Sequence, residues 1–185
     1  MCYDLKKLTR MKKIVFLSLV SILLFAGCEK IDKLTQFDMG YKMTVVIPSS
    51  TGINLPFNFF TPDVQTDSEA TFAIHSTSKE LIEEVLLTKL TLTLTSPGNG
   101  NLGFIKSIDV FISAEGLPEE KISWKTSSSA AKTIELDVTG KDLKEYIKKD
   151  EFKLRLSTVT NELLTSEHKI EVNANFFVDA KVLGQ

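Results

Sequence analysis

The sequence predicts an all-β fold: an antiparallel β-sandwich of the immunoglobulin-like, Greek-key type, with two short helices. Apolar and polar residues alternate with a period of two in segment after segment, which is typical of strands that bury one face. The alternating segments are rich in Val, Ile, Thr and Phe, residue types that favour strands. The segments are joined by connections of a few to about a dozen residues, which suit antiparallel sheets packed face to face.

Eight segments carry this alternation. They are 41–47, 69–76, 88–96, 107–113, 121–125, 134–138, 152–157 and 168–178. The clearest is 88–96, where Leu90, Leu92 and Leu94 share one face and threonines occupy the other. In 121–125 the alternation groups Ile122 with Trp124 and sets both against Lys121, Ser123 and Lys125.

Two short helices are expected between strands, near 78–84 and 140–148. Thr77 is followed three residues later by Glu80, which is the spacing of a capping box. Thr139 is the expected N-cap of the second helix, in which Leu143, Tyr146 and Ile147 form an apolar stripe.

One apolar stretch, INLPFNFFTP at 53–62, fits neither the strand period nor the helix period. Its prolines predict a loop or an edge segment, since proline lacks the N–H that the interior of a sheet uses. Its rings, Phe57, Phe59 and Phe60, have two interpretations. They fold back over one end of the sandwich, or they are exposed as a partner-contact patch. We expect most of them to fold back, with Phe59 or Phe60 buried.

The N-terminal part has the layout of a secretory signal. Met11-Lys12-Lys13 is basic, the run from Ile14 to Phe25 is apolar, and Ala26-Gly27 are small. The apolar run is shorter than the roughly 20 residues that a spanning helix needs. Residues 1–10 do not fit the pattern, so Met11 is the expected start.

The sequence Phe25-Ala26-Gly27-Cys28 resembles the lipobox of bacterial lipoproteins. The resemblance covers residues 11–28 and departs from the usual pattern by having Phe25 where leucine is common. It implies that the chain is cut before Cys28 and that Cys28 carries lipid. We therefore expect a signal peptide at 1–27, a lipid-anchored tether at 28–40 and a single domain at 41–185.

The resemblance also implies where the protein works. Its expected location is the cell envelope, anchored to a membrane outside the cytoplasm, the outer membrane where a cell has two. The other cysteine, Cys2, lies before Met11, so no disulfide is expected within the domain. The chain has 22 Lys and Arg against 24 Asp and Glu. Most of the first 27 residues' charges are basic, which leaves the rest acidic and argues against a nucleic-acid partner.

The sequence contains no motif of a known catalytic site, such as G-x-S-x-G, H-E-x-x-H or a P-loop. His75 and His168, one in each of two predicted strands, are read as surface residues and not as metal ligands. We predict no catalytic residue, no metal and no cofactor. The expected function is a non-enzymatic binding or scaffolding domain, whose partner is an envelope protein or a glycan. The alternative is a hydrolase with a site built from residues scattered in the sequence. Trp124 is the only tryptophan, which weakens the glycan interpretation.

Overall fold

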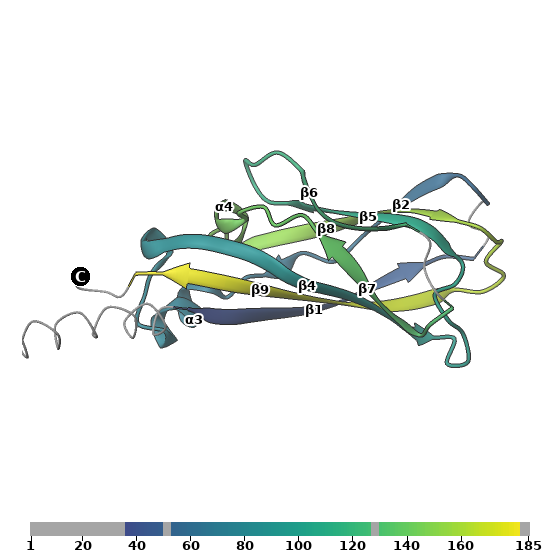
Figure 1. Cartoon of the computed structure of the whole chain (residues 1–185), viewed down its shortest axis with the longest axis horizontal. Helices are drawn as coiled ribbons and strands as arrows, with labels where there is room; N and C mark the ends of the chain where they lie inside the picture. Colours follow the sequence, from purple (N-terminus) through teal and green to yellow (C-terminus); the bar gives the residue numbers. More distant parts are fainter. Residues whose placement is uncertain (1–35, 50–52, 127–129, 182–185) are drawn as a thin grey trace, which may run out of the picture.

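Figure 1 shows the computed structural model of the chain, which describes residues 36–49, 53–126 and 130–181. In chain order the elements are β1 (Phe37–Ile47), β2 (Pro56–Phe60), β3 (Val64–Gln65), α3 (Ser68–Ile74), the 3₁₀ turn η2 (Lys79–Leu81), β4 (Ile82–Ser96), β5 (Ile105–Ser113), β6 (Glu120–Thr126), β7 (Thr133–Val138), α4 (Lys144–Ile147), β8 (Glu151–Thr160) and β9 (His168–Ala180). Of the helices that the structure describes, none has the length and apolar character needed to cross a bilayer.

The strands form one antiparallel sheet in the order β1-β9-β4-β7-β6-β5-β8-β2, and β3 pairs with β8. The sheet folds over, so that β1, β9 and β4 form one layer and β6, β5, β8 and β2 form the other (Figure 1). Strand β7 pairs with β4 and with β6 and so joins the layers. Strands β5, β6 and β7 are consecutive neighbours, and β8 returns to lie beside β5, which is a Greek key. The predicted β-sandwich class is confirmed.

The core lies between the layers and is made by the inward residues of the alternating strands. Leu92 pairs with Val172 on one side and with Ile134 on the other, and it is fully buried. Aromatic rings link the layers: the Tyr41 ring makes edge contacts with Phe152 and Phe176, at centroid distances of 5.1 and 5.7 Å. Such pairs add about 0.5–1.5 kcal/mol to the free energy of unfolding beyond the area they bury.

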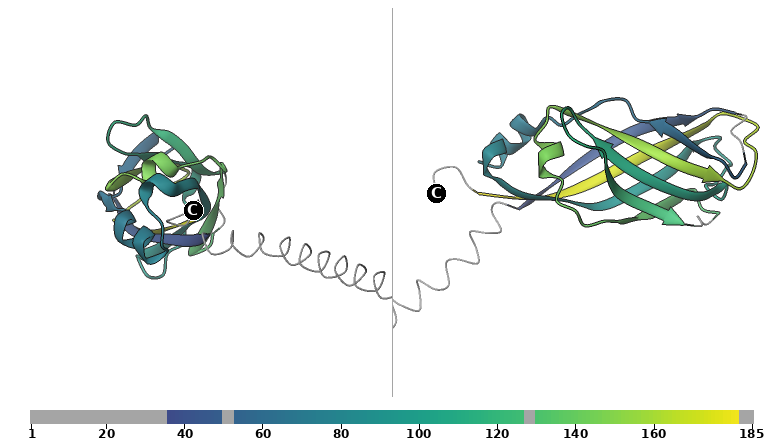
Figure 2. Two further views of the ribbon diagram at one scale, coloured as in Figure 1. Left: turned by 90° about the vertical axis from the view of Figure 1, so that its left-hand side faces the viewer. Right: turned by 90° about the horizontal axis from the view of Figure 1, so that it is seen from above.

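The two ends of the sandwich differ. Helices α3 and α4 lie at one end, with the start of β1, and we call this the helical end (Figures 1 and 2). At the opposite end, the loop end, lie the connections between β4 and β5 and between β8 and β9. Because the strands run the length of the molecule, the register of β1 places Phe37 at the helical end and Ile47 at the loop end.

The prediction of a strand at 69–76 is wrong, because Ser68–Ile74 forms helix α3. The segment is too short for its apolar residues to distinguish the period of two of a strand from the period of about 3.6 of a helix. Its conformation follows from tertiary packing: Phe72 is fully buried, with its ring 6.1 Å from that of Phe37. The chain enters the helix through Asp67, whose φ of 45° lies in the left-handed region that Asp tolerates better than most residues.

Three other boundaries differ from those that the sequence predicted. The helix expected near 78–84 is reduced to η2, because Ile82 already begins β4 and is buried there. The helix expected near 140–148 is the single turn Lys144–Ile147, where Asp142 accepts hydrogen bonds from the N–H groups of Lys144 and Val85. Strand β1 starts at Phe37 and so includes the last residues of the expected 28–40 tether.

Candidate functional site

The predicted site residues fall in different places. Cys28, the expected point of lipid attachment, lies outside the described residues. Phe57, Phe59 and Phe60 belong to β2, which is an edge strand with proline at its first position. Phe59 is buried, Phe57 is half-buried against it at a ring-centroid distance of 4.8 Å, and Phe60 is 56% exposed on the opposite side of the strand. The strand pleat thus places the Phe57 and Phe59 rings on one side of β2 and the Phe60 ring on the other.

Phe60 belongs to a group of aromatic and charged side chains on the solvent side of four neighbouring strands, β2, β8, β5 and β6. We call this surface the aromatic face, and its members are Asn58, Phe60, Asp109, Phe111, Lys121, Trp124 and Arg155. The strand register aligns Phe60, Arg155, Phe111 and Lys121 in one row across the four strands. A second row aligns Asn58, Ser157, Asp109 and Trp124. Directly opposed side chains on one face of a sheet contact each other, so each row is a continuous surface.

Trp124 lies on this face because of a β-bulge. The pairing of β5 with β6 shifts between Val110 and Phe111, so that Val110 opposes Ser123 while Phe111 opposes Lys121. The extra residue, Ile122, is buried beside Ser123, which is also buried. Lys121 and Trp124 are three residues apart and would otherwise face opposite sides; the bulge places both outside. The prediction that Trp124 shares a face with Ile122 is therefore wrong.

Arg155 is the centre of the aromatic face and is held from three directions. Its guanidinium donates two hydrogen bonds to the carboxylate of Glu119, at 2.8 and 2.5 Å, and a third to Asn58 Oδ1 at 2.7 Å. The guanidinium carbon lies 4.1 Å from the centroid of the Phe111 ring, a cation–π arrangement. A bidentate pair of this kind orients the planar fork more rigidly than a single ion pair does.

The hydrogen bond from Arg155 lowers the pKa of Glu119 below its ordinary value of 4.5. A carboxyl whose pKa is lowered by folding stabilises the fold above its ordinary pKa, and this contribution is lost as the pH falls through the folded value. We therefore expect Glu119→Gln to unfold at lower urea than wild type at pH 7. The gap should close on acidification, as measured by urea midpoints over a pH series. Glu162→Gln, in the exposed connection after β8, is the control. A gap that widens in acid would contradict the assignment.

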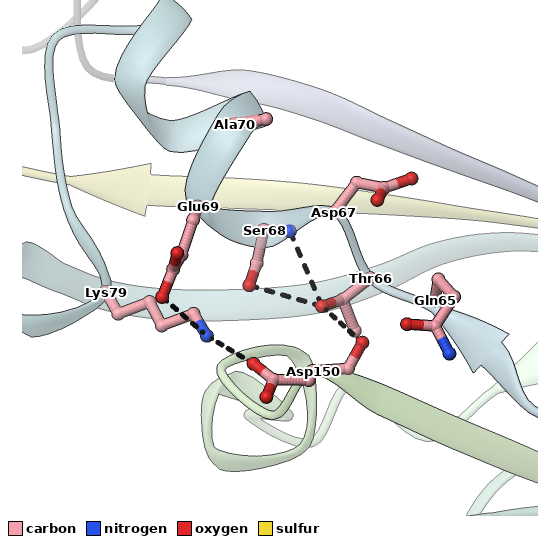
Figure 3. Close-up of a pocket in the computed structure, with 8 residues that line it drawn as sticks. All are labelled: Gln65, Thr66, Asp67, Ser68, Glu69, Ala70, Lys79 and Asp150. Carbon is pink, nitrogen blue, oxygen red and sulfur yellow. Dashed lines mark hydrogen bonds and ion pairs between the residues drawn. The ribbon is translucent and has the colours of Figure 1, made fainter.

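A second candidate is a shallow depression of about 240 Å³ at the helical end, between α3, η2 and the start of β8 (Figure 3). Lys79 Nζ lies 2.9 Å from Asp150 Oδ1 and 3.5 Å from Glu69 Oε1. The hydrogen bond between them raises the pKa of Lys79 and lowers that of Asp150. The buried Thr66 hydroxyl donates to the Lys149 carbonyl at 2.6 Å. These polar groups bind one another, so their contacts hold α3 against the start of β8.

The histidines are not brought together. His75 follows α3 and stacks on Phe37 at a centroid distance of 3.8 Å, at the helical end. His168 pairs with Ile47 at the loop end. About ten residues of β1 separate the two places, which corresponds to roughly 33 Å of strand. Within residues 36–49, 53–126 and 130–181, no three His, Cys, Asp or Glu side chains are placed to hold a metal ion.

The sequence contained a signal for the aromatic face. Phe111 occupies the polar side of an otherwise regular alternation, between Asp109 and Ser113. Phe60 stands next to the inward-facing Phe59 and so must face outward wherever the segment is a strand. The partners of these rings on β6 and β8 come from distant segments, and their alignment depends on the register of the sheet.

Comparisons with known proteins identify no family. No family model matches the chain, and no curated protein matches it. Among solved structures it is similar to GH31 CBM32-2, a structure bound to GalNAc, with 18% identity, a TM-score of 0.30, and coverage of 49% of this chain and 58% of that one. It is also similar to the capsid of the Helicobacter pylori bacteriophage KHP30, with 7% identity, a TM-score of 0.37, and coverage of 77% and 92%. A third is the recombinant peptide:N-glycanase F, with 9% identity, a TM-score of 0.40, and coverage of 77% and 42%.

Proposed function

We propose that this chain is a non-enzymatic binding domain of the cell envelope, held at a membrane by lipid on Cys28 and binding its partner through the aromatic face. The observation that carries the binding part is the position of Phe60, 56% exposed beside the fixed guanidinium of Arg155. Phe59 on the other side of the strand fills the core, so the Phe60 ring is left for contacts at the surface. Binding sites are enriched in aromatic residues and Arg for the contact area they supply.

The position of the lipid would set the orientation of the domain. Phe37 is nine positions after Cys28 in the sequence, and an extended chain over nine steps reaches about 30 Å. Phe37 lies at the helical end, so this end would be nearest the membrane, and the loop end would be farthest from it. The aromatic face runs along the side of the sandwich between the two ends, where a lipid-anchored domain would leave it accessible.

Two features favour binding over the alternative, a hydrolase. A general acid needs a carboxyl whose pKa is raised, usually by burial. The described carboxyls with a shifted pKa are Glu80, Glu119, Asp142, Asp150 and Glu171, and in each the pKa is lowered. The depression at the helical end also has its charged groups paired, with Lys79 between Asp150 and Glu69.

The anchor is tested by substituting the cysteine. Cells that express the full chain and are fed a labelled fatty acid should produce labelled protein in the membrane fraction. We expect Cys28→Ala to lose the label and to leave the membrane fraction, because two or more acyl chains are what hold such a protein stably. Ser18→Ala, which changes one small side chain in the apolar run of the signal, is the control and should behave as wild type. Label that persists in Cys28→Ala would overturn the proposal.

A further inference from the structure

We infer that the aromatic face binds a neutral, extended glycan, across the strands from Phe60 to Trp124. This inference rests on the proposed function and names the ligand class of the same surface. Its basis is a juxtaposition: two aromatic side chains at the borders of the face, a fixed guanidinium between them, and charged groups that are already neutralised in pairs.

The spacing of the rings fits several linked sugars. Phe60 lies on β2 and Trp124 on β6, with β8 and β5 between them. Three steps of about 4.8 Å between neighbouring strands, with an offset of two residues or about 7 Å along the strands, place the two positions about 16 Å apart, which is about the length of a trisaccharide. The apolar side of a pyranose ring packs on an aromatic ring, so Phe60 and Trp124 would each contact one sugar. Arg155, supported by the Phe111 ring, would contact the sugar between them.

The charges of the face indicate that the ligand is neutral. Both cations on it lie close to an anion: Arg155 to Glu119 at 2.5 Å and Lys121 to Asp109 at 2.6 Å. Two lysines next to the face are paired as well, Lys125 with Asp137 at 3.9 Å and Lys153 with Asp63 at 2.8 Å. A charged ligand would have to displace one of these partners and leave its charge uncompensated. A polyhydroxyl ligand places no net charge against the face, so the pairs stay intact.

The face also has hydrogen-bonding capacity of the kind that hydroxyl groups use. Arg155 has five N–H donors, of which three are engaged by Glu119 and Asn58 within the described residues. The other two N–H groups of Arg155 have no partner in the described part of the chain. The same holds for the Asn58 amide N–H₂ and the Trp124 indole N–H. Asp109 and Glu119 supply acceptor oxygens beside them. Because Arg155 is held in place before binding, little side-chain entropy would be lost.

The test uses the purified mature protein on an array of neutral and acidic oligosaccharides, followed by calorimetric titration with the best neutral hexasaccharide. We expect binding to neutral members. We also expect Phe60→Ala and Trp124→Ala each to weaken affinity about tenfold, the loss of one ring contact. Leu163→Ala is the control, since Leu163 is 54% exposed in the connection after β8 and so matches Phe60 in exposure. It should bind as wild type does, and the thermal midpoints of the variants show whether each is folded.

Three results would overturn the inference: no neutral glycan bound, acidic glycans bound more tightly than neutral ones, or full affinity in both Phe60→Ala and Trp124→Ala. A Phe60-dependent cross-link to an envelope protein, with no glycan bound, would reject the glycan and leave the proposed function standing. Chromatography of the recovered hexasaccharide tests whether the protein is instead an enzyme that cleaves the glycan. Cleavage products that disappear when Arg155 or Glu119 is substituted would reject the non-enzymatic function, while the glycan remains the ligand.

Discussion

Leu92→Asp should abolish the folded state. Leu92 is fully buried in β4, where β9 and β7 supply Val172 and Ile134 as its neighbours on either side. An aspartate there would be a charge in the core with no partner, and the cost of burying it exceeds several kcal/mol. Stabilities of whole domains are about 5–15 kcal/mol, so one such charge removes most or all of the free energy of unfolding.

Far-UV circular dichroism and urea denaturation would check this result. The matched control is Thr95→Asp, which places the same charge three residues along the same strand but on an exposed side chain. It loses only the hydrogen bond from the Thr95 hydroxyl to the Lys169 carbonyl, a contribution of about 1 kcal/mol. A folded Leu92→Asp variant with a stability near that of Thr95→Asp would contradict the position of Leu92 in the core.

Phe59→Ala should lower the thermal midpoint by about 10 °C, while Phe60→Ala should change it little. The Phe59 side chain is 7% exposed and pairs across the strands with Leu156, which is fully buried. Removing a buried ring costs about 3–5 kcal/mol, because the apolar contacts are lost and a cavity remains. For a domain of this size each kcal/mol corresponds to about 2–4 °C.

Phe60 is the matched control, since it is the same residue type, one position later, on the same strand. Its side chain is 56% exposed, and surface substitutions usually change stability by less than about 0.5 kcal/mol. Differential scanning calorimetry of the two variants measures their thermal midpoints and so compares the contribution of each ring to stability. Equal destabilisation by both would show that the two rings pack alike. A large effect of Phe60→Ala alone would reverse the assignment of the two faces of β2.

The length and regularity of the local apolar pattern explain which strand predictions were right and which was wrong. The segment 88–96 was predicted as a strand from its leucines, and β4 includes it, because a run of this length with a strict period of two leaves one way to bury its apolar residues. The segment 69–76 is too short to show a clear strand or helix period. It forms a helix in which Phe72 packs against Phe37. The two residues are far apart in the sequence, so no local pattern contained this contact.

By itself the sequence determined seven strands of the sandwich, β1 and β4 to β9, since alternation in a strand is a local property of consecutive side chains. It also predicted a loop or an edge segment at 53–62, because proline cannot donate to a ladder, and β2 in this stretch is an edge strand. The tertiary structure alone decided which side chains meet on the aromatic face. The bulge at Ile122 turned Trp124 outward, and the pairing of β2 with β8 placed Phe60 opposite Arg155. Both depend on register, which is set by contacts between strands distant in sequence and reverses every side chain when it slips by one residue.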